Sequence, residues 1–255
     1  MVRSSGTSFE QDPNKSAINI VTLPKRNISI AKVEKMQKIE DNIRRIQLEL
    51  KQNEVQLIVV SKYREISEIQ AAYNSGQRDF AENRVQALLE REESLPKDIK
   101  WHLIGHLQTN KVKYIAPFIH VIHSVDSLKL AEEINKQAIK HNRQIDILLQ
   151  THVAQEESKF GIPPENFDGF VEALLENKLS GIKIRGIMGM ATFTDNTAII
   201  HHEFDRIETL FKTIKHRYFQ NDASFNELSI GMSGDYRIAM EHGATMVRIG
   251  SAIFE

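Results

Sequence analysis

Two short apolar segments near the C-terminus run directly into small residues that suit an anion. Residues 228–235 read Leu-Ser-Ile-Gly-Met-Ser-Gly-Asp, and residues 246–251 read Met-Val-Arg-Ile-Gly-Ser. Glycines allow backbone N–H groups to approach an anion, a serine adds a hydroxyl, and a helix that begins there adds a favourable dipole. We therefore expect Ser233, Gly250 and Ser251 to bind a phosphate group.

Arg248 lies within the second of these segments. It stands between Val247 and Ile249, so strand alternation directs its side chain to the face opposite both. A guanidinium that is buried there requires an acceptor. Two interpretations stay open: an internal ion pair with a carboxylate such as Glu82 or Asp79, or a contact with an acceptor on a bound ligand.

Lys62 follows a continuous apolar run, residues 57–60, of the kind shown by a parallel strand that is buried on both faces. At the end of such a strand, burial favours the neutral amine, which attacks a carbonyl carbon. The alternative is a solvated lysine, as most lysines are. Combined with Arg248 and the phosphate-binding residues, a buried amine describes a site for an aldehyde that carries a phosphate.

Strand-like and helix-like segments alternate along the chain and must position these residues. Apolar residues recur every three or four positions over residues 33–52, which predicts a helix before the first strand. Eight strands then follow, and each except the last is predicted to precede a helix. They fall in the ranges 57–60, 78–81, 101–104, 118–123, 145–150 and 182–188 and in the two C-terminal segments.

Eight alternating units favour one α/β domain, a single closed (β/α)8 TIM barrel. The first helix can then fill the ring position that lacks a helix after the eighth strand. Chemistry in such a barrel gathers at the C-terminal ends of the strands, where Lys62, Asn83 and Ser233 lie. An open doubly wound sheet is the rival architecture, but the G-x-G-x-x-G turn that would favour it is missing after the first strand.

Composition limits the classes of protein. The 33 basic and 34 acidic side chains nearly cancel, so no bulk charge attracts nucleic acid or a membrane surface. No apolar run is long enough to span a membrane, and no cysteine is available for a disulfide or a thiolate. These features fit a cytoplasmic protein. Residues 1–33 are polar with weak periodicity, so we expect a poorly ordered extension before a barrel that covers residues 34–255.

Five sequence motifs occur in order from about residue 35 to the C-terminus. They are Val-Ser-Lys at 60–62, Phe-Ala-Glu-Asn-Arg-Val-Gln at 80–86, Trp-His-Leu-Ile-Gly-His-Leu-Gln-Thr-Asn-Lys at 101–111, and the segments at 228–235 and 247–254. Together they resemble the motifs of the pyridoxal phosphate homeostasis proteins. That family is similar to the barrel domain of alanine racemase standing alone.

The resemblance implies a cofactor and a role for each site residue. Pyridoxal 5′-phosphate (PLP) would form a Schiff base with Lys62, Asn83 would lie against it, and Arg248 would face the pyridine nitrogen. The phosphate would be held by the small residues of both C-terminal segments, Ser233, Gly250 and Ser251. The resemblance also implies a role in intracellular PLP homeostasis, with delivery to apo-PLP enzymes and without robust catalysis. We expect a monomer or a weak dimer.

Two other functions stay open: a PLP-dependent amino-acid racemase of the alanine type, and a barrel that binds another phosphorylated metabolite without covalent chemistry. An arginine opposite the ring nitrogen cannot accept its proton, so the ring stays neutral and stabilises carbanions poorly. A racemase tolerates this but needs a second base, for which Tyr63, Tyr73 and Tyr236 are candidates. We expect no metal site, because His102 and His106 lie in a strand-to-loop segment rather than on one helix face.

Overall fold

The strands of the chain close into a parallel barrel. The computed structural model describes Met1, residues 30–154 and residues 160–255, and within these residues eight strands pair in chain order, with β8 returning to β1. The predicted (β/α)8 TIM barrel is therefore confirmed. The strands are β1 Gln56–Val60, β2 Asp79–Glu82, β3 Lys100–Leu103, β4 Val121–Val125, β5 Ile145–Gln150, β6 Ile182–Met188, β7 Glu227–Met232 and β8 Met246–Ile249.

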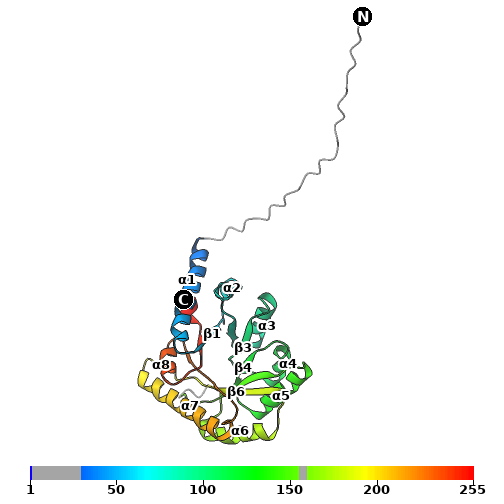
Figure 1. The fold of residues 1–255 in the computed structure, drawn as a ribbon, viewed down its shortest axis with the longest axis vertical. Coiled ribbons are helices and arrows are strands. Elements are labelled where there is room, and N and C mark those ends of the chain that lie inside the picture. Colours follow the sequence, from blue (N-terminus) through cyan, green and yellow to red (C-terminus); the bar gives the residue numbers. More distant parts are fainter. Residues whose placement is uncertain (2–29, 155–159) are drawn as a thin grey trace.

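Helices lie outside the strands (Figure 1). Among the described residues, no helix combines the length and the apolar composition needed to cross a membrane. The α-helices are α1 Ile30–Lys51, α2 Ile66–Asn74, α3 Val85–Ser94, α4 Val112–Ile115, α5 Leu128–Lys140, α6 Phe167–Glu176, α7 Thr197–Tyr218, α8 Tyr236–Glu241 and α9 Ser251–Phe254. Two 3-10 turns, η1 Thr109–Lys111 and η2 Pro164–Asn166, precede α4 and α6.

Helix α1 completes the ring of helices between α8 and α2. Its Glu49 accepts a hydrogen bond of 2.9 Å from Tyr236 in α8, and its Lys35 pairs with Glu68 in α2 at 2.9 Å. The predicted position of the first helix is therefore confirmed. The expectation that no helix follows the eighth strand is wrong, because the short α9 follows β8 and packs on α1 through Asn42, which donates to a carbonyl of α9 at 3.0 Å.

Two separate apolar clusters stabilise the barrel. The larger one fills the space between strands and helices and includes Val247 and Ile249 of β8. The smaller one lies inside the barrel and consists of Ile58, Val60, Ala81, Val121, Leu148, Met188 and Met246. Since residues of a strand alternate between faces, Arg248 lies on the inner face with Met246. This outcome confirms the predicted orientation of Arg248 relative to its two neighbours.

Two predicted boundaries differ from the structure by three residues or more. Strand β4 begins at Val121 rather than at residue 118, because the amides of Phe118 and Ile119 donate to Ile115 and continue the turn at the end of α4. Helix α1 begins at Ile30, within the segment predicted as an extension. The remainder of that extension, residues 2–29, lies outside the described residues.

Candidate functional site

A cavity of about 690 Å³ opens at the C-terminal ends of the strands. Every residue that the sequence nominated for binding lines it. These residues are Lys62, Asn83, Ser233, Arg248, Gly250 and Ser251. They follow β1, β2, β7 and β8 or belong to β8, so closure of the barrel brings together residues that are up to 189 positions apart, from 62 to 251.

Lys62 is held at the cavity by a tight turn after β1. The buried Ser61 hydroxyl donates to Glu82 Oε1 at 2.7 Å, and the amide of Arg64 donates to the Ser61 carbonyl at 3.1 Å. Between them Tyr63 adopts a φ of 64°, which is uncommon outside glycine and typical of functional sites. The Lys62 side chain lines the cavity but is exposed, so the expected burial of its amine is not found.

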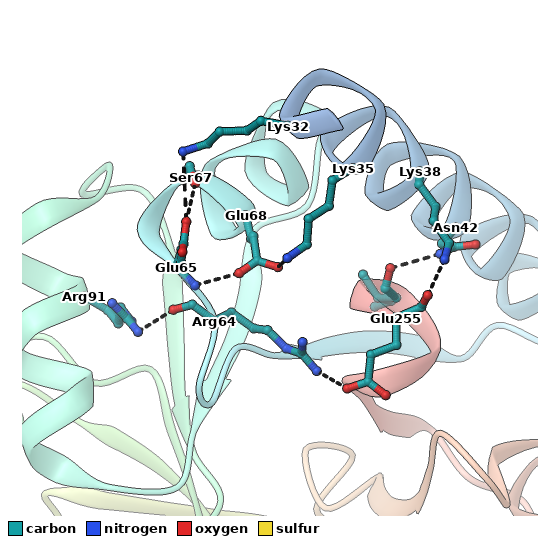
Figure 2. A network of polar contacts seen from close by, with 11 residues as sticks. Lys32, Lys35, Lys38, Asn42, Arg64, Glu65, Ser67, Glu68, Arg91 and Glu255 are labelled. Carbon is teal, nitrogen blue, oxygen red and sulfur yellow. Dashed lines mark hydrogen bonds and ion pairs between the residues drawn. The ribbon is translucent and has the colours of Figure 1, made fainter. Parts of the chain in front are cut away.

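Polar contacts from three helices fix the same turn (Figure 2). Arg91 of α3 donates to the carbonyl of Arg64 at 2.5 Å, and the Arg64 guanidinium pairs with Glu255 directly after α9. On the other side, Glu68 of α2 accepts from the amide of Glu65 at 2.8 Å while its second oxygen pairs with α1. The segment that carries Lys62 is therefore anchored to α1, α2, α3 and the end of the chain.

Arg248 is buried, with 3% of its surface exposed, and it points into the barrel. One terminal nitrogen donates to the carbonyl and the hydroxyl of Ser229 at 2.6 and 2.7 Å, and the other donates to the carbonyl of Gly189 at 2.9 Å. Burial lowers the pKa of Arg248 to about 10, so it stays a cation at neutral pH. Guanidinium carries five N–H donors, so two remain beyond these three bonds.

Neither carboxylate proposed for an ion pair contacts Arg248 directly. Glu82 lies on the outer face of β2, where it accepts from Ser61 and is 3.8 Å from Arg91. Burial raises the pKa of Glu82 above its ordinary value, against the opposing effect of the Ser61 hydrogen bond. Asp79 is linked to Arg248 only through other side chains. Within the described residues, the internal ion pair is therefore absent and the cavity side of Arg248 stays available.

Ser233 joins the loops after β7 and β8. Its hydroxyl oxygen accepts from the amides of Gly250 and Ala252 at 3.1 and 3.3 Å. These bonds hold the Ser233 hydroxyl at the end of the cavity that Gly250 and Ser251 also line, where its O–H can donate to an anion. The sequence analysis did not identify Ala252 as a partner of Ser233, although Ala252 directly follows Gly250 and Ser251 and could have been considered with them.

Glycines allow the loops around the site to approach closely. A Cβ on Gly105 would lie 2.2 Å from the carbonyl oxygen of Asn83, so the loops after β2 and β3 touch only because residue 105 is glycine. Gly231 in β7 has a φ of 91°, and a Cβ there would lie 2.6 Å from Ala239. Asn83 is half-buried in the cavity wall, beside the apolar Ile104.

The tyrosines considered as a second base lie in different places. Tyr63 lines the cavity and is 77% exposed. Tyr73 donates to Asp98 at 2.8 Å on the outer surface, and Tyr236 donates to Glu49 between α8 and α1. Within the described residues, Tyr63 is the one tyrosine that lines this cavity.

Histidines 102 and 106 diverge in space. His102 is buried inside the barrel, 2.8 Å from His123, whereas His106 stacks on Phe160 outside it, with ring centroids 4.0 Å apart. They therefore form no joint metal site. The sequence reasoning missed His123 and Ser229, which extend a polar cluster from His102 to Arg248. Alternation along their strands was the only sequence signal for their inward orientation.

Comparison with known proteins places the chain in a family. The family described as alanine racemase, N-terminal domain, matches residues 35–255. A pyridoxal phosphate homeostasis protein of Aquifex aeolicus (strain VF5) is 40% identical over 187 residues, which are 73% of this chain and 80% of that protein. The chain belongs to the pyridoxal phosphate homeostasis protein family. A second member, from Haemophilus influenzae, is 37% identical and shares 80% of this chain and 85% of its own.

Solved structures agree with this family membership. PipY of Synechococcus elongatus PCC7942, solved with PLP bound, is 32% identical with a TM-score of 0.77, and the match covers 85% of this chain and 100% of PipY. The PLP-free PipY structure gives 33% identity and a TM-score of 0.79 over the same shares. Alanine racemase from Streptomyces lavendulae, 14% identical with a TM-score of 0.71 over 86% of this chain and 56% of its own, shares the fold alone.

Proposed function

We propose that this chain binds PLP as a Schiff base on Lys62 and acts in PLP homeostasis, including delivery to apo-PLP enzymes, rather than in catalysis. One observation carries the proposal: the Lys62 amine, the Arg248 guanidinium and the Ser233 hydroxyl line the same cavity. The name shared by its relatives and the PLP-bound structure of PipY support the choice of cofactor.

The donors around the cavity match the acceptors of PLP. A phosphate needs several N–H and O–H donors. The amides of Gly250 and Ala252 donate to Ser233 Oγ, which leaves the Ser233 O–H to donate to the phosphate, and Ser251, the first residue of α9, lines the same cavity. A neutral pyridine nitrogen needs one donor, which the two remaining N–H groups of Arg248 can supply. The cavity of about 690 Å³ has the size usual for a small-ligand pocket. These residues fit PLP without requiring a further charged group.

The chemistry of the site favours holding PLP over catalysis. PLP supplies an aldehyde that forms imines with amines, and its ring becomes a strong electron sink when the nitrogen is protonated. Arg248 is a donor that cannot accept that proton, so it stabilises the unprotonated nitrogen. Lys62 retains the aldehyde by a bond that water reverses. A site of this composition holds and releases the cofactor but supports carbanion chemistry weakly.

An alanine-type racemase is the second candidate function. It needs a base on each face of the substrate, and the position of Tyr63 in the cavity wall is the observation that favours it. Conversion of L-alanine to D-alanine by the PLP-loaded protein, followed by chiral chromatography, separates the two functions. Turnover that Tyr63→Phe abolishes would support the racemase, and absence of turnover supports the carrier.

The first experiment is a visible absorption spectrum of the PLP-loaded protein before and after borohydride reduction. We expect an imine band that reduction removes, that Lys62→Ala lacks, and that the matched surface variant Lys113→Ala retains. A band that persists in Lys62→Ala contradicts the assignment of the Schiff base. A protein that stays colourless with added PLP refutes the choice of cofactor and leaves the third candidate, a barrel for another phosphorylated metabolite.

Delivery is tested separately with an apo-aminotransferase. The PLP-loaded protein and an equal concentration of free PLP are each added in the presence of an excess of a small-molecule amine that scavenges free PLP. We expect the protein to restore aminotransferase activity faster than free PLP does, because bound PLP is shielded from the scavenger. Equal rates would refute delivery while leaving binding intact. The prediction of a monomer or weak dimer is tested by sedimentation.

A further inference from the structure

Hydrogen bonds connect Arg248 with the opposite end of the barrel. Arg248 donates to Ser229 Oγ at 2.7 Å, and Ser229 Oγ lies 3.1 Å from His123 Nδ1. His123 Nε2 lies 2.8 Å from His102 Nδ1, and His102 Nε2 lies 3.2 Å from Asp79 Oδ1. Both histidines and Ser229 are fully buried. Because Asp79 is the first residue of β2, this hydrogen-bond chain runs from the cavity to the N-terminal end of the strands.

The two ends of this hydrogen-bond chain, Arg248 and Asp79, have fixed roles as donor and acceptor. A guanidinium only donates and a carboxylate only accepts, so Asp79 requires a proton on His102 Nε2. If His102 is neutral, its Nδ1 must accept from His123 Nε2–H. If His123 is neutral as well, its Nδ1 must accept the Ser229 proton, which leaves a lone pair of Ser229 for Arg248. Every proton then points from Arg248 toward Asp79.

Burial favours the neutral state of His123 that this direction requires. Desolvation, together with the charges of His102, Arg248 and His120, holds the pKa of His123 well below its ordinary value. A protonated histidine would add a second buried cation to a chain that contains one carboxylate, which is costly. Burial, the largest single effect, opposes the ionisation of Asp79, but the interactions with His102, Lys100 and Gln56 together outweigh it and lower the pKa of Asp79.

Few other charged groups surround this hydrogen-bond chain. Gln56 of β1 bonds to Asp79, and the ring of His120 lies 5.6 Å from that of His102. Lys100 and Asp146, which act with opposite sign on His120, stand at the same end of the barrel. At the cavity end, Asp235 and Lys62 line the same cavity as Arg248, and the charge of Asp235 raises the pKa of Arg248 against the larger effect of burial.

We propose that Asp79 is a counter-charge of Arg248, in addition to Asp235, and its positioning residue, acting through Ser229, His123 and His102 by hydrogen bonds that all point one way. The hydrogen-bond chain links the buried guanidinium to a carboxylate that does not contact it. A carboxylate in direct contact would occupy the N–H groups that face the cavity. The arrangement therefore keeps Arg248 charged, oriented and available to a ligand acceptor.

The arrangement of protons rests on the structure alone, whereas its effect on a ligand rests on the proposed function. In that function, the negative charge of Asp79 offsets the field of Arg248 at the ring and at the Lys62 imine. Removing this charge makes the protonated imine less stable. The pH at which the imine loses its proton should then fall.

Nitrogen NMR of the PLP-free protein tests the proton arrangement. Two-bond ¹H–¹⁵N spectra distinguish the Nε2–H tautomer, the Nδ1–H tautomer and the cation of each histidine. Signals are assigned through the variants His102→Gln and His123→Gln, and His216 is the control for a solvent-exposed ring. We expect both buried rings as neutral Nε2–H tautomers at pH 7. A cationic His102 or an Nδ1–H His123 would mean that the chain runs the other way and would overturn the proposal.

Asp79→Asn tests the counter-charge in the PLP-loaded protein. We expect the pH midpoint of imine deprotonation, read from the absorption band, to fall by about half a unit. The matched control is Asp98→Asn, because Asp98 is exposed and bonds Tyr73 and Arg78 on the outer surface; its midpoint should not move. An unchanged midpoint in folded Asp79→Asn overturns the role of Asp79.

The two experiments separate this proposal from the proposed function. If the unaltered protein forms no imine with PLP, the proposed function fails, and the histidine spectra still decide the direction of the hydrogen-bond chain. If Asp79→Asn does not fold, which thermal denaturation reveals, the spectra of the unaltered protein decide the proposal without any variant.

Discussion

Ser233 provides the sharpest test of the phosphate end of the cavity. Its hydroxyl oxygen accepts from the amides of Gly250 and Ala252 at 3.1 and 3.3 Å, and we assign its O–H to the phosphate. Ser233→Ala removes the hydroxyl and leaves both amides in place. Since nothing larger is introduced, the loops after β7 and β8 have no steric reason to move.

The expected loss follows from the number of hydrogen bonds removed. One hydrogen bond to a charged phosphate contributes about 1.5–3 kcal/mol, so the affinity for PLP should fall by about 10- to 100-fold. Ser251→Ala is the matched control, because it keeps the amide of residue 251 and removes only an exposed hydroxyl. Its effect on PLP affinity should stay within about twofold.

Comparison of PLP with pyridoxal isolates the phosphate. Dissociation constants for both ligands are measured by absorption titration in the unaltered protein, Ser233→Ala and Ser251→Ala. We expect Ser233→Ala to weaken PLP binding and to leave pyridoxal binding unchanged, because pyridoxal lacks the phosphate. Equal weakening of both ligands would show that Ser233 acts on the fold of the cavity rather than on the phosphate, and our assignment would be refuted.

Two further predictions concern stability. Gly231→Ala should lower the free energy of unfolding by about 2–4 kcal/mol in urea denaturation, because a Cβ at a φ of 91° would lie 2.6 Å from Ala239. The control is Gly234→Ala, where a Cβ meets nothing within 4 Å, and it should change the free energy of unfolding by under about 0.5 kcal/mol. Similar losses in both variants would contradict this explanation. Burial depresses the pKa of His123 below the ordinary value of 6.5, so its contribution to stability is complete above pH 6.5 and is lost as the pH falls below it. Urea midpoints measured at several pH values should therefore decline on acidification below 6.5, and His123→Gln, which does not titrate, should reduce the decline.

Residue type predicted the bounds of two strands well. Strands β5 and β6 have the predicted bounds, Ile145–Gln150 and Ile182–Met188, although Asp146, Lys183 and Arg185 interrupt their apolar residues at half-buried positions. The start of β4 was misplaced, since residues 118 and 119 are as apolar as a strand but bond to the end of α4. Apolar composition reports burial, and it does not report which backbone partner a residue finds.

For the site, the sequence nominated the right neighbourhood but not its electrostatics. Lys62, Arg248 and Ser233 were found because strand ends in a barrel converge. The acceptor for Arg248 was left open between a carboxylate such as Glu82 or Asp79 and a group on a bound ligand. The structure shows that Glu82 faces outward while Asp79 is connected through three other side chains. No spacing rule links β2, β3, β4, β7 and β8 in one line of hydrogen bonds.

The sequence by itself determined the residue types available for chemistry, the alternation that places Arg248 on the inner face, and the barrel that brings strand ends together. Those properties are local, since they depend on neighbours within a few positions. Tertiary structure alone decided that Lys62 is exposed at the cavity, that Tyr63 rather than Tyr73 or Tyr236 borders it, and that two buried histidines stand between Arg248 and Asp79. These outcomes depend on how strands pair around a closed barrel, because only closure brings their side chains within hydrogen-bond distance.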